Sequence, residues 1–161
     1  MTAPVFALLD ADATEELGQR LAQAFTAPLV IHLHGDLGAG KSTLARAMLR
    51  ALGVTGAIKS PTYTLIERYR LADGEAAHLD LYRIAEAAEL DFLGLDELAS
   101  QAQLWLVEWP ERGGSGLPAA DLDISLAVAG EGRRAQLHAG SDIGRVLLAR
   151  LNEMAAPGAS S

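Results

Sequence analysis

Residues 29–44 read LVIHLHGDLGAGKSTL, and the fold prediction rests on this stretch. Its first part, Leu29–Leu33, is a short apolar run rich in β-forming residues, which is typical of a buried strand. Its second part, Gly35–Ser42, matches the pattern G-x-x-x-x-G-K-[ST] at every fixed position. After the loop, apolar residues recur at helical spacing: Leu44, Ala47, Met48 and Ala51. The stretch therefore predicts a strand, a glycine-rich loop and a helix, in that order.

This glycine-rich loop is suited to binding a polyphosphate. Glycines let the backbone curl so that several N–H groups point at one anion, and the start of the following helix adds a favourable field. Lys41 can reach the β- and γ-phosphates, and the hydroxyl of Ser42 can bind Mg²⁺. A chance match in a glycine-rich chain is the alternative, but the strand before the loop and the helix after it argue against chance. The sequence thus predicts a P-loop organised around Gly35, Gly40, Lys41 and Ser42.

The rest of the chain alternates between helical and strand patterns. Asp10 or Asp12 can cap the first helix, with Glu15 placed as in a capping box, and Asp73-Gly74 is a tight-turn signal between two strands. Helices are expected over Ala13–Phe25, Ala85–Asp91, Leu95–Ser100 and after Ser141; strands are expected over Thr62–Leu71, Ala76–Tyr82, Leu104–Val107, Leu122–Val128 and Arg134–His138. These elements predict an α/β fold with a mixed, mostly parallel sheet flanked by helices and with antiparallel hairpin additions.

The chain has 161 residues, which suits one domain, because domains most often have ~100–150 residues. We predict a single domain over residues 1–154 and a disordered tail of small residues over 155–161. The absence of cysteine excludes a disulfide-stapled fold and thiolate chemistry. No signal-peptide pattern opens the sequence, and no apolar run approaches the ~20 residues that cross a bilayer. We therefore expect a cytoplasmic protein that has no membrane partner.

The charge balance argues against a protein that binds nucleic acid tightly by itself. The formal net charge is −8, and only two lysines are present, Lys41 and Lys59. Phosphate contacts dominate nucleic-acid affinity, so such proteins usually carry a basic face. Direct, tight RNA or DNA binding is not expected, although a local arginine patch remains compatible with the sequence. The plain interpretation of the acidic balance is solubility.

Two acids are candidates for the metal site and for orienting water, both of which nucleotide hydrolysis needs. Glu108 follows the apolar strand Leu104–Val107, and Asp80 follows a weaker apolar run. The alternative for Glu108 is a surface acid at a strand end, and the alternative for Asp80 is an acid that is solvated or paired in a hairpin. Trp109 is either a core residue or a neighbour of the site, and periodicity does not decide between them.

The sequence also bears on the roles of three histidines and on the base of the nucleotide. His32 and His34 fall on one face of the strand that enters the loop, and His78 has no acid at ligand spacing except Asp80, so we interpret all three histidines as packing residues. Guanine-specific P-loop proteins commonly carry an Asn-Lys-x-Asp loop. The only asparagine here is Asn152, near the end of the last helix, so adenine is the expected base.

With these motifs assembled, the sequence resembles the TsaE (YjeE) family from about Phe6 to Leu151. Four blocks carry the resemblance: Gly35–Thr43, Lys59–Leu65, His78–Arg83 and Val107–Glu111. The resemblance implies a P-loop ATPase fold and a role in bacterial tRNA modification. The implied partners are the TsaD and TsaB proteins, and tRNA is reached only through their complex. Together they support transfer of a threonylcarbamoyl group onto the adenosine beside the anticodon, in tRNAs that read codons starting with A.

The resemblance also implies ATP and Mg²⁺ as ligands and assigns roles by position. The residues that would hold the phosphates are Gly38, Ala39, Gly40, Lys41, Ser42 and Thr43. Ser42 and Glu108 would bind Mg²⁺, and Ser42 stands where the family commonly has threonine, which has the same hydroxyl. Lys41, Asp80 and Glu108 would be the catalytic residues, with Asp80 near the metal or the attacking water. The remaining assignments are Thr62 in a switch-like segment, Trp109 beside the site, Asp10 and Ala11 near the adenine, and Arg133 or Arg134 near the nucleotide.

Two other functions remain open at the level of the sequence. A small-molecule kinase needs an acceptor pocket and usually a lid with several arginines, whereas the loop Glu111–Pro118 contains only Arg112. A non-enzymatic nucleotide sensor would bind ATP only to change its affinity for a partner. The expected activity is slow ATP hydrolysis by the isolated protein and faster hydrolysis when a partner completes the site.

Overall fold

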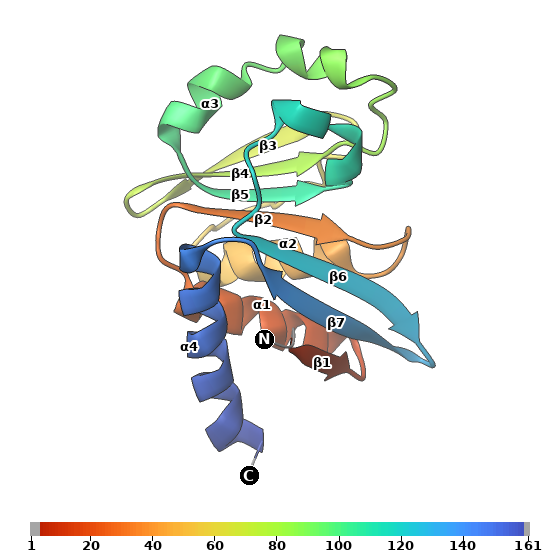
Figure 1. Ribbon diagram of the computed structural model, residues 1–161, viewed down its shortest axis with the longest axis vertical. Helices are drawn as coiled ribbons and strands as arrows, with labels where there is room; N and C mark the ends of the chain where they lie inside the picture. Colours follow the sequence, from red (N-terminus) through yellow and green to blue (C-terminus); the bar gives the residue numbers. More distant parts are fainter. Residues whose placement is uncertain (1–3, 160–161) are drawn as a thin grey trace.

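The structure is a computed structural model that describes residues 4–159, with residues 155–159 described by their backbone alone. Its strands form a single sheet in the order β1-β7-β6-β2-β5-β4-β3 (Figure 1). The strands are β1 (Val5–Leu8), β2 (Leu29–His34), β3 (Ile66–Leu71), β4 (Gly74–Asp80), β5 (Ala102–Glu108), β6 (Leu122–Ala129) and β7 (Gly132–Ala139). The helices are α1 (Ala11–Ala24), α2 (Lys41–Ala51), α3 (Leu95–Gln101) and α4 (Asp142–Ala159), and short 3₁₀ turns cover η1 (Ala87–Phe92), η2 (Pro110–Arg112) and η3 (Gly114–Gly116).

The centre of the sheet is parallel and its two margins are antiparallel. Strands β6, β2, β5 and β4 run parallel to one another. The hairpin β6–β7 and strand β1 extend one side, and the hairpin β3–β4 ends the other. The predicted α/β fold with antiparallel hairpin additions is therefore confirmed.

Each face of the central strands is covered, which explains their nearly continuous apolar sequences. Alternate residues of β5 point to opposite faces: Leu104 and Leu106 join a core formed with α1, α2 and α4, while Trp105 and Val107 join a smaller core formed with η1 and α3. All four side chains are buried. Two buried faces fix the register of the strands, because a slip by one residue would exchange the two sets of side chains.

Helices α1 and α4 begin with side-chain caps. Asp10 is the N-cap of α1, and its Oδ1 accepts a hydrogen bond from the N–H of Ala13 at 2.9 Å. The alternative, a capping box of Asp12 and Glu15, is therefore wrong. Ser141 precedes α4 as expected, and its Oγ accepts the N–H of Gly144 at 3.1 Å.

The predicted strand Thr62–Leu71 is correct only in its second half. Residues 61–64 form a turn, and the strand begins at Ile66. Leu65 has a left-handed backbone with a φ of 70°, and its N–H bonds to the carbonyl of Pro61 at 2.8 Å. Tertiary context thus overrides the β propensity of the two threonines in this segment. The turn leaves Thr62 in a loop, where the family resemblance places a switch-like segment.

Smaller differences lie at the ends of strands. Strand β1 was not expected, and it pairs only with β7. Strand β4 is antiparallel to β3 as expected, but it spans Gly74–Asp80 and not Ala76–Tyr82. The register joins Leu71 to Gly74, so the turn lies one residue earlier than Asp73-Gly74.

At the end of the chain, the backbone of α4 is described to Ala159, and Ser160 and Ser161 lie outside the described residues. The single domain over residues 1–154 and the disordered tail over 155–161 both stay predictions. Within residues 4–159, no helix combines the length and the apolar character needed to span a membrane.

Candidate nucleotide-binding and active site

The glycine loop connects the carboxyl end of β2 to the first turn of α2, as the sequence predicts. Gly40 is the residue before α2, with a φ of 107°, which strains any residue that has a Cβ atom. Gly35 begins the loop with a φ of 144°, and a Cβ atom there would lie 2.5 Å from the carbonyl oxygen of Leu126. The loop therefore needs glycine at both positions. The first N–H groups of α2 have no partner within the helix, so they are available to an anion.

Lys41 is folded back over the loop that it follows. Its Nζ donates hydrogen bonds to the carbonyl oxygens of Gly35 and Asp36, the latter at 3.1 Å, and lies 4.1 Å from the centre of the Trp109 ring. Burial lowers the pKa of Lys41, and the charges of Glu108 and other nearby acids oppose this shift. The side chain is only 4% exposed, so its ammonium charge is directed into the site rather than into bulk water.

Asp80 and Glu108 lie side by side at the ends of two parallel strands. They are register partners across β4 and β5, and both side chains are buried. Burial raises the pKa of Asp80, and the nearby charge of Glu108 raises it further. The N–H of Tyr82 donates to Oδ1 of Asp80 at 3.0 Å and opposes the shift. Two acids held together in this way favour a cation between or beside them.

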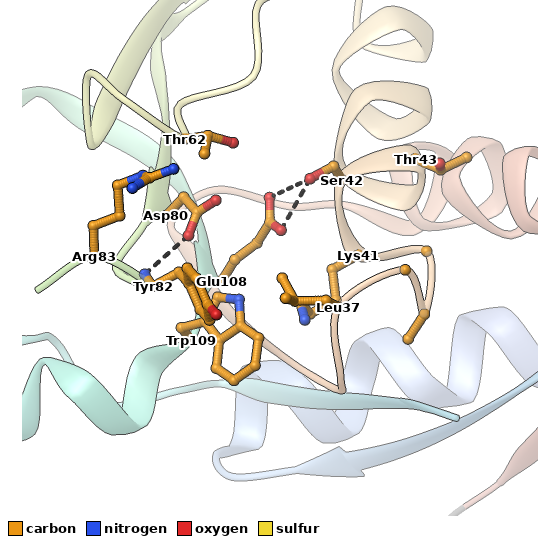
Figure 2. A pocket seen from close by; sticks show the side chains of 13 residues that line it. Leu37, Lys41, Ser42, Thr43, Thr62, Asp80, Tyr82, Arg83, Glu108 and Trp109 are labelled. Atoms are coloured by element: carbon orange, nitrogen blue, oxygen red, sulfur yellow. Dashed lines mark hydrogen bonds between the residues drawn. The ribbon is translucent and has the colours of Figure 1, made fainter. Parts of the chain in front are cut away.

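Ser42 and Glu108 meet from opposite sides of the site. The Oγ of Ser42 lies 3.0 Å from each carboxylate oxygen of Glu108, within hydrogen-bonding distance of both (Figure 2). A hydroxyl beside a carboxylate fits Mg²⁺, which binds proteins through one or two carboxylates and keeps waters and phosphate oxygens as its other ligands. The part of the chain that the structure describes contains no group of three or more His, Cys, Asp or Glu suited to a metal. The donors therefore fit a site completed by a nucleotide, not a cage made by protein alone.

These side chains line one cavity of about 420 Å³. Figure 2 shows the site residues converging on it from the loop, from the ends of β4 and β5, and from the segment that contains Thr62. The lining residues are Leu37, Gly38, Ala39, Gly40, Lys41, Ser42, Thr43, Thr62, Asp80, Tyr82, Arg83, Glu108 and Trp109. The structure thus brings together the phosphate-binding, metal-binding and catalytic residues expected from the sequence, with Thr62 at the rim.

A second cavity of about 190 Å³ adjoins the same loop. Of the four residues assigned near the nucleotide from looser motifs, Asp10, Ala11 and Arg133 line it. The guanidinium of Arg133 donates to the carbonyl oxygen of Gly38 at 3.0 Å, which ties β7 to the loop. Gly38, Gly40 and Thr43 line both cavities. Arg133, rather than Arg134, is therefore the arginine that faces the loop.

Trp109 has both of the roles that the sequence left open. It has a left-handed backbone, with a φ of 57°, directly after β5. Its ring stacks at an angle on Tyr82, with centroids 4.9 Å apart, and packs partly against the smaller core. The ammonium of Lys41 lies over the face of the same ring. Trp109 therefore joins the core to the site.

The histidines behave differently from one another. His32 and His34 each have a partner distant in the sequence: Nε2 of His32 lies 3.1 Å from the carbonyl oxygen of Pro118, and Nε2 of His34 lies 2.7 Å from Oδ1 of Asp123. His78 is completely buried, as expected of a packing residue, but the acid beside it is not Asp80. Nε2 of His78 lies 2.6 Å from Oε2 of Glu108.

Tyr82 and Arg83 also line the cavity, and neither was assigned a role from the sequence. The guanidinium of Arg83 lies 4.6 Å from the centre of the Tyr63 ring, which links the end of β4 to the segment around Thr62. The sequence offered one indication that they lie near the site: both residues follow Asp80 and Leu81 within a block that resembles the family. Their side chains reach the cavity because the chain turns there, and residue spacing does not show this turn.

Comparisons with known proteins identify relatives of this chain. A family model described as "Threonylcarbamoyl adenosine biosynthesis protein TsaE" matches residues 8–136. The chain is 40% identical over 120 residues to the tRNA threonylcarbamoyladenosine biosynthesis protein TsaE of Haemophilus influenzae, covering 74% of this chain and 76% of that protein. It is 38% identical over 116 residues to the protein of the same name from Bacillus subtilis, covering 71% and 72%.

A solved structure agrees with the fold along nearly the whole chain. A crystal structure of YdiB from Bacillus subtilis matches with a TM-score of 0.80 at 29% identity, covering 96% of this chain and 97% of that one. The predicted P-loop NTPase fold is thereby confirmed.

Proposed function

Because this chain belongs to the TsaE family, we propose that it binds and hydrolyses Mg-ATP in support of the TsaD–TsaB complex. That complex forms N6-threonylcarbamoyladenosine beside the anticodon of tRNAs that read codons starting with A. The observation that carries the proposal is the convergence of Lys41 and Ser42, from the glycine loop, with Asp80 and Glu108, from two strand ends, on one cavity. This set of groups serves phosphoryl transfer, which depends mainly on positioning and electrostatic stabilisation.

In this proposal the triphosphate lies along the glycine loop. The backbone N–H groups at the start of α2 bind phosphate oxygens, and Lys41 exchanges its bonds to the carbonyls of Gly35 and Asp36 for bonds to the β- and γ-phosphates. The adenine end extends toward the second cavity, beside Ala11 and Arg133.

Ser42 and Glu108 would hold Mg²⁺, with Asp80 close by. The ion supplies neutralisation of charge on the phosphate oxygens during transfer. Asp80 presents one carboxylate oxygen to the N–H of Tyr82, which leaves its second oxygen able to orient a water molecule. Water then attacks the γ-phosphorus, the bond to the bridging oxygen breaks, and ADP and phosphate are the products. Lys41 stabilises the charge on the transferred group.

The partner assignment rests on the family and on the charge of the chain. A net charge of −8 does not favour contact with tRNA by this chain alone, whereas a protein that docks on a protein complex needs no basic face. The test is reconstitution of the modification with TsaD, TsaB and the other components, with and without this chain. Mass spectrometry of the tRNA nucleosides should show repeated turnover only when the chain and ATP are both present.

The same reconstitution separates the competing functions. If Lys41→Ala supports normal modification, the assignment of Lys41 is wrong. Transfer of phosphate to a metabolite, instead of its release into water, would identify a kinase. If Glu108→Ala keeps both complex formation and modification, ATP serves as a signal and not as a substrate. Loss of modification with retained complex formation supports hydrolysis as the required step.

A further inference from the structure

We propose that His78 is a positioning residue that holds the carboxylate of Glu108 in the orientation needed at the metal site. The inference rests on the proposed function, because it assigns His78 a purpose through Glu108. His78 lies within β4, two residues before Asp80, and it is completely buried. Nothing in its own sequence context distinguishes it from a packing residue.

The sheet register explains why His78 reaches Glu108. Asp80 pairs with Glu108 across β4 and β5, and His78 pairs with Leu106. Because alternate residues share a face of a strand, His78, Asp80 and Glu108 all point toward the face covered by α2. His78 and Glu108 are diagonal neighbours on that face, and Nε2 lies 2.6 Å from Oε2.

The two ring nitrogens of His78 differ in their partners. Nε2 lies against Glu108, whereas Nδ1 is buried and has no partner among the described residues. A ring N–H donates and a carboxylate oxygen accepts, so in this proposal the Nε2–H of His78 donates to Oε2 of Glu108.

The contact restrains the carboxylate in a way that packing alone does not. Oε2 is held by His78 while both oxygens lie 3.0 Å from the hydroxyl of Ser42. Two donors on different elements, His78 on β4 and Ser42 on α2, restrain the orientation of the carboxylate more than the hydroxyl of Ser42 would by itself. Partners that orient metal ligands typically contribute about 10–100-fold to metal affinity or activity. An apolar residue would fill a fully buried place in β4 without an unpaired nitrogen, so packing does not explain a histidine there.

The test uses three variants of the full-length protein, with the apparent Kd of Mg²⁺ measured by titrating the ion into the protein bound to a non-hydrolysable ATP analogue. His78→Leu keeps a similar volume and removes the donor. His78→Gln places an amide N–H near the position of Nε2, whereas His78→Asn places it near the position of Nδ1, too far from Glu108. We expect the Leu and Asn variants to raise the Kd of Mg²⁺ by about 10–100-fold, and the Gln variant to restore most of the affinity.

Two further readouts separate positioning from folding. The affinity for the same analogue in EDTA should be unchanged in all folded variants, because His78 acts only through the metal ligand. Nitrogen-15 NMR of the metal-free wild-type protein should show a proton on Nε2 of His78. If His78→Leu fails to fold, the comparison of Gln with Asn decides.

Wild-type Mg²⁺ affinity in His78→Asn, or the absence of a proton on Nε2, would overturn the role of His78 while leaving the proposed function intact. Failure of the wild-type protein to bind the analogue at all would instead overturn the proposed function, and the role of His78 with it.

Discussion

Replacing Asp80 by asparagine should stabilise the nucleotide-free protein at neutral pH while it lowers ATP hydrolysis. Asp80 and Glu108 are buried register partners, so two negative charges lie on neighbouring strands without enough water to screen them. Asparagine removes one charge and keeps an oxygen that can accept the N–H of Tyr82, a bond of 3.0 Å in the wild type. The variant therefore changes the charge and little else.

The size of the effect follows from the strand spacing. Neighbouring strands lie about 4.8 Å apart, and two like charges at that distance repel by about 3 kcal/mol at an effective dielectric of about 20. The ammonium of Lys41 attracts both acids and offsets much of this repulsion. We expect a net stabilisation of about 1 kcal/mol, which is about 2–4 °C in Tm for a chain of this length.

The direction in which stability changes with pH follows from the pKa of Asp80. The pKa of Asp80 is raised above that of an ordinary aspartate, so the folded state binds a proton more tightly than the unfolded state. As pH rises through the interval between the unfolded and folded pKa values, the wild-type protein loses stability from this residue. The loss is complete above the folded pKa. The difference between Asp80→Asn and wild type should therefore be small near pH 4 and reach its full size by pH 7.

The assay is thermal unfolding followed by circular dichroism, in EDTA without nucleotide, at several pH values from 4 to 8. Asp80→Ala is the matched control, because it also removes the charge but leaves the N–H of Tyr82 without its acceptor, which costs about 1–3 kcal/mol if that group stays dry. A less stable Asp80→Asn at pH 7, or a difference that does not grow between pH 4 and pH 7, would show that the acid pair is not under electrostatic strain.

Three further predictions concern the glycine loop. Lys41→Ala should lower kcat for ATP hydrolysis by about 10²–10³-fold without loss of folded structure, and circular dichroism together with a steady-state phosphate assay checks both. Ser42→Thr should keep the Mg²⁺ dependence of hydrolysis because it keeps the hydroxyl, whereas Ser42→Ala should require more Mg²⁺; equal Mg²⁺ dependence in the two variants would contradict a metal role. Gly35→Ala should destabilise the protein by about 1–3 kcal/mol in urea unfolding, because its Cβ would meet the carbonyl oxygen of Leu126 at 2.5 Å, and should cost more than Gly38→Ala, where a Cβ meets nothing within 4 Å.

The centre of the fold was predictable because its signals are local. The strand, loop and helix of residues 29–44 are adjacent in the chain, and each carries its own pattern. Asp80 and Glu108 were found for a related reason, since both end buried strands, and acids at carboxyl ends of parallel strands meet at one edge of a sheet. What could be predicted was therefore the position of each acid along its strand.

The parts that could not be predicted depend on pairing between distant segments. Strand β1 has four residues and only β7 as a neighbour, so its own sequence carries little of the signal that holds it. Thr62 and Thr64 have high strand propensity, yet residues 61–64 form a turn in which Thr62 lines the cavity. The bond from His78 to Glu108 joins residues 30 apart and exists only in one register of β4 against β5.

The charges at the site give a physical reason for the proposed dependence on Mg²⁺. At their formal charges, Asp80 and Glu108 contribute two negative charges and Lys41 contributes one positive charge, so these three groups sum to −1. Phosphates without a metal would face two buried carboxylates that repel them, whereas the same phosphates with a divalent cation offer those carboxylates a partner. Lys41 approaches from the loop and the acids approach from the strand ends (Figure 2), so a bound phosphate and a bound metal ion would each meet the opposite charge. The two neighbouring carboxylates, which repel each other in the nucleotide-free protein, would thus also favour ATP bound to magnesium over ATP alone.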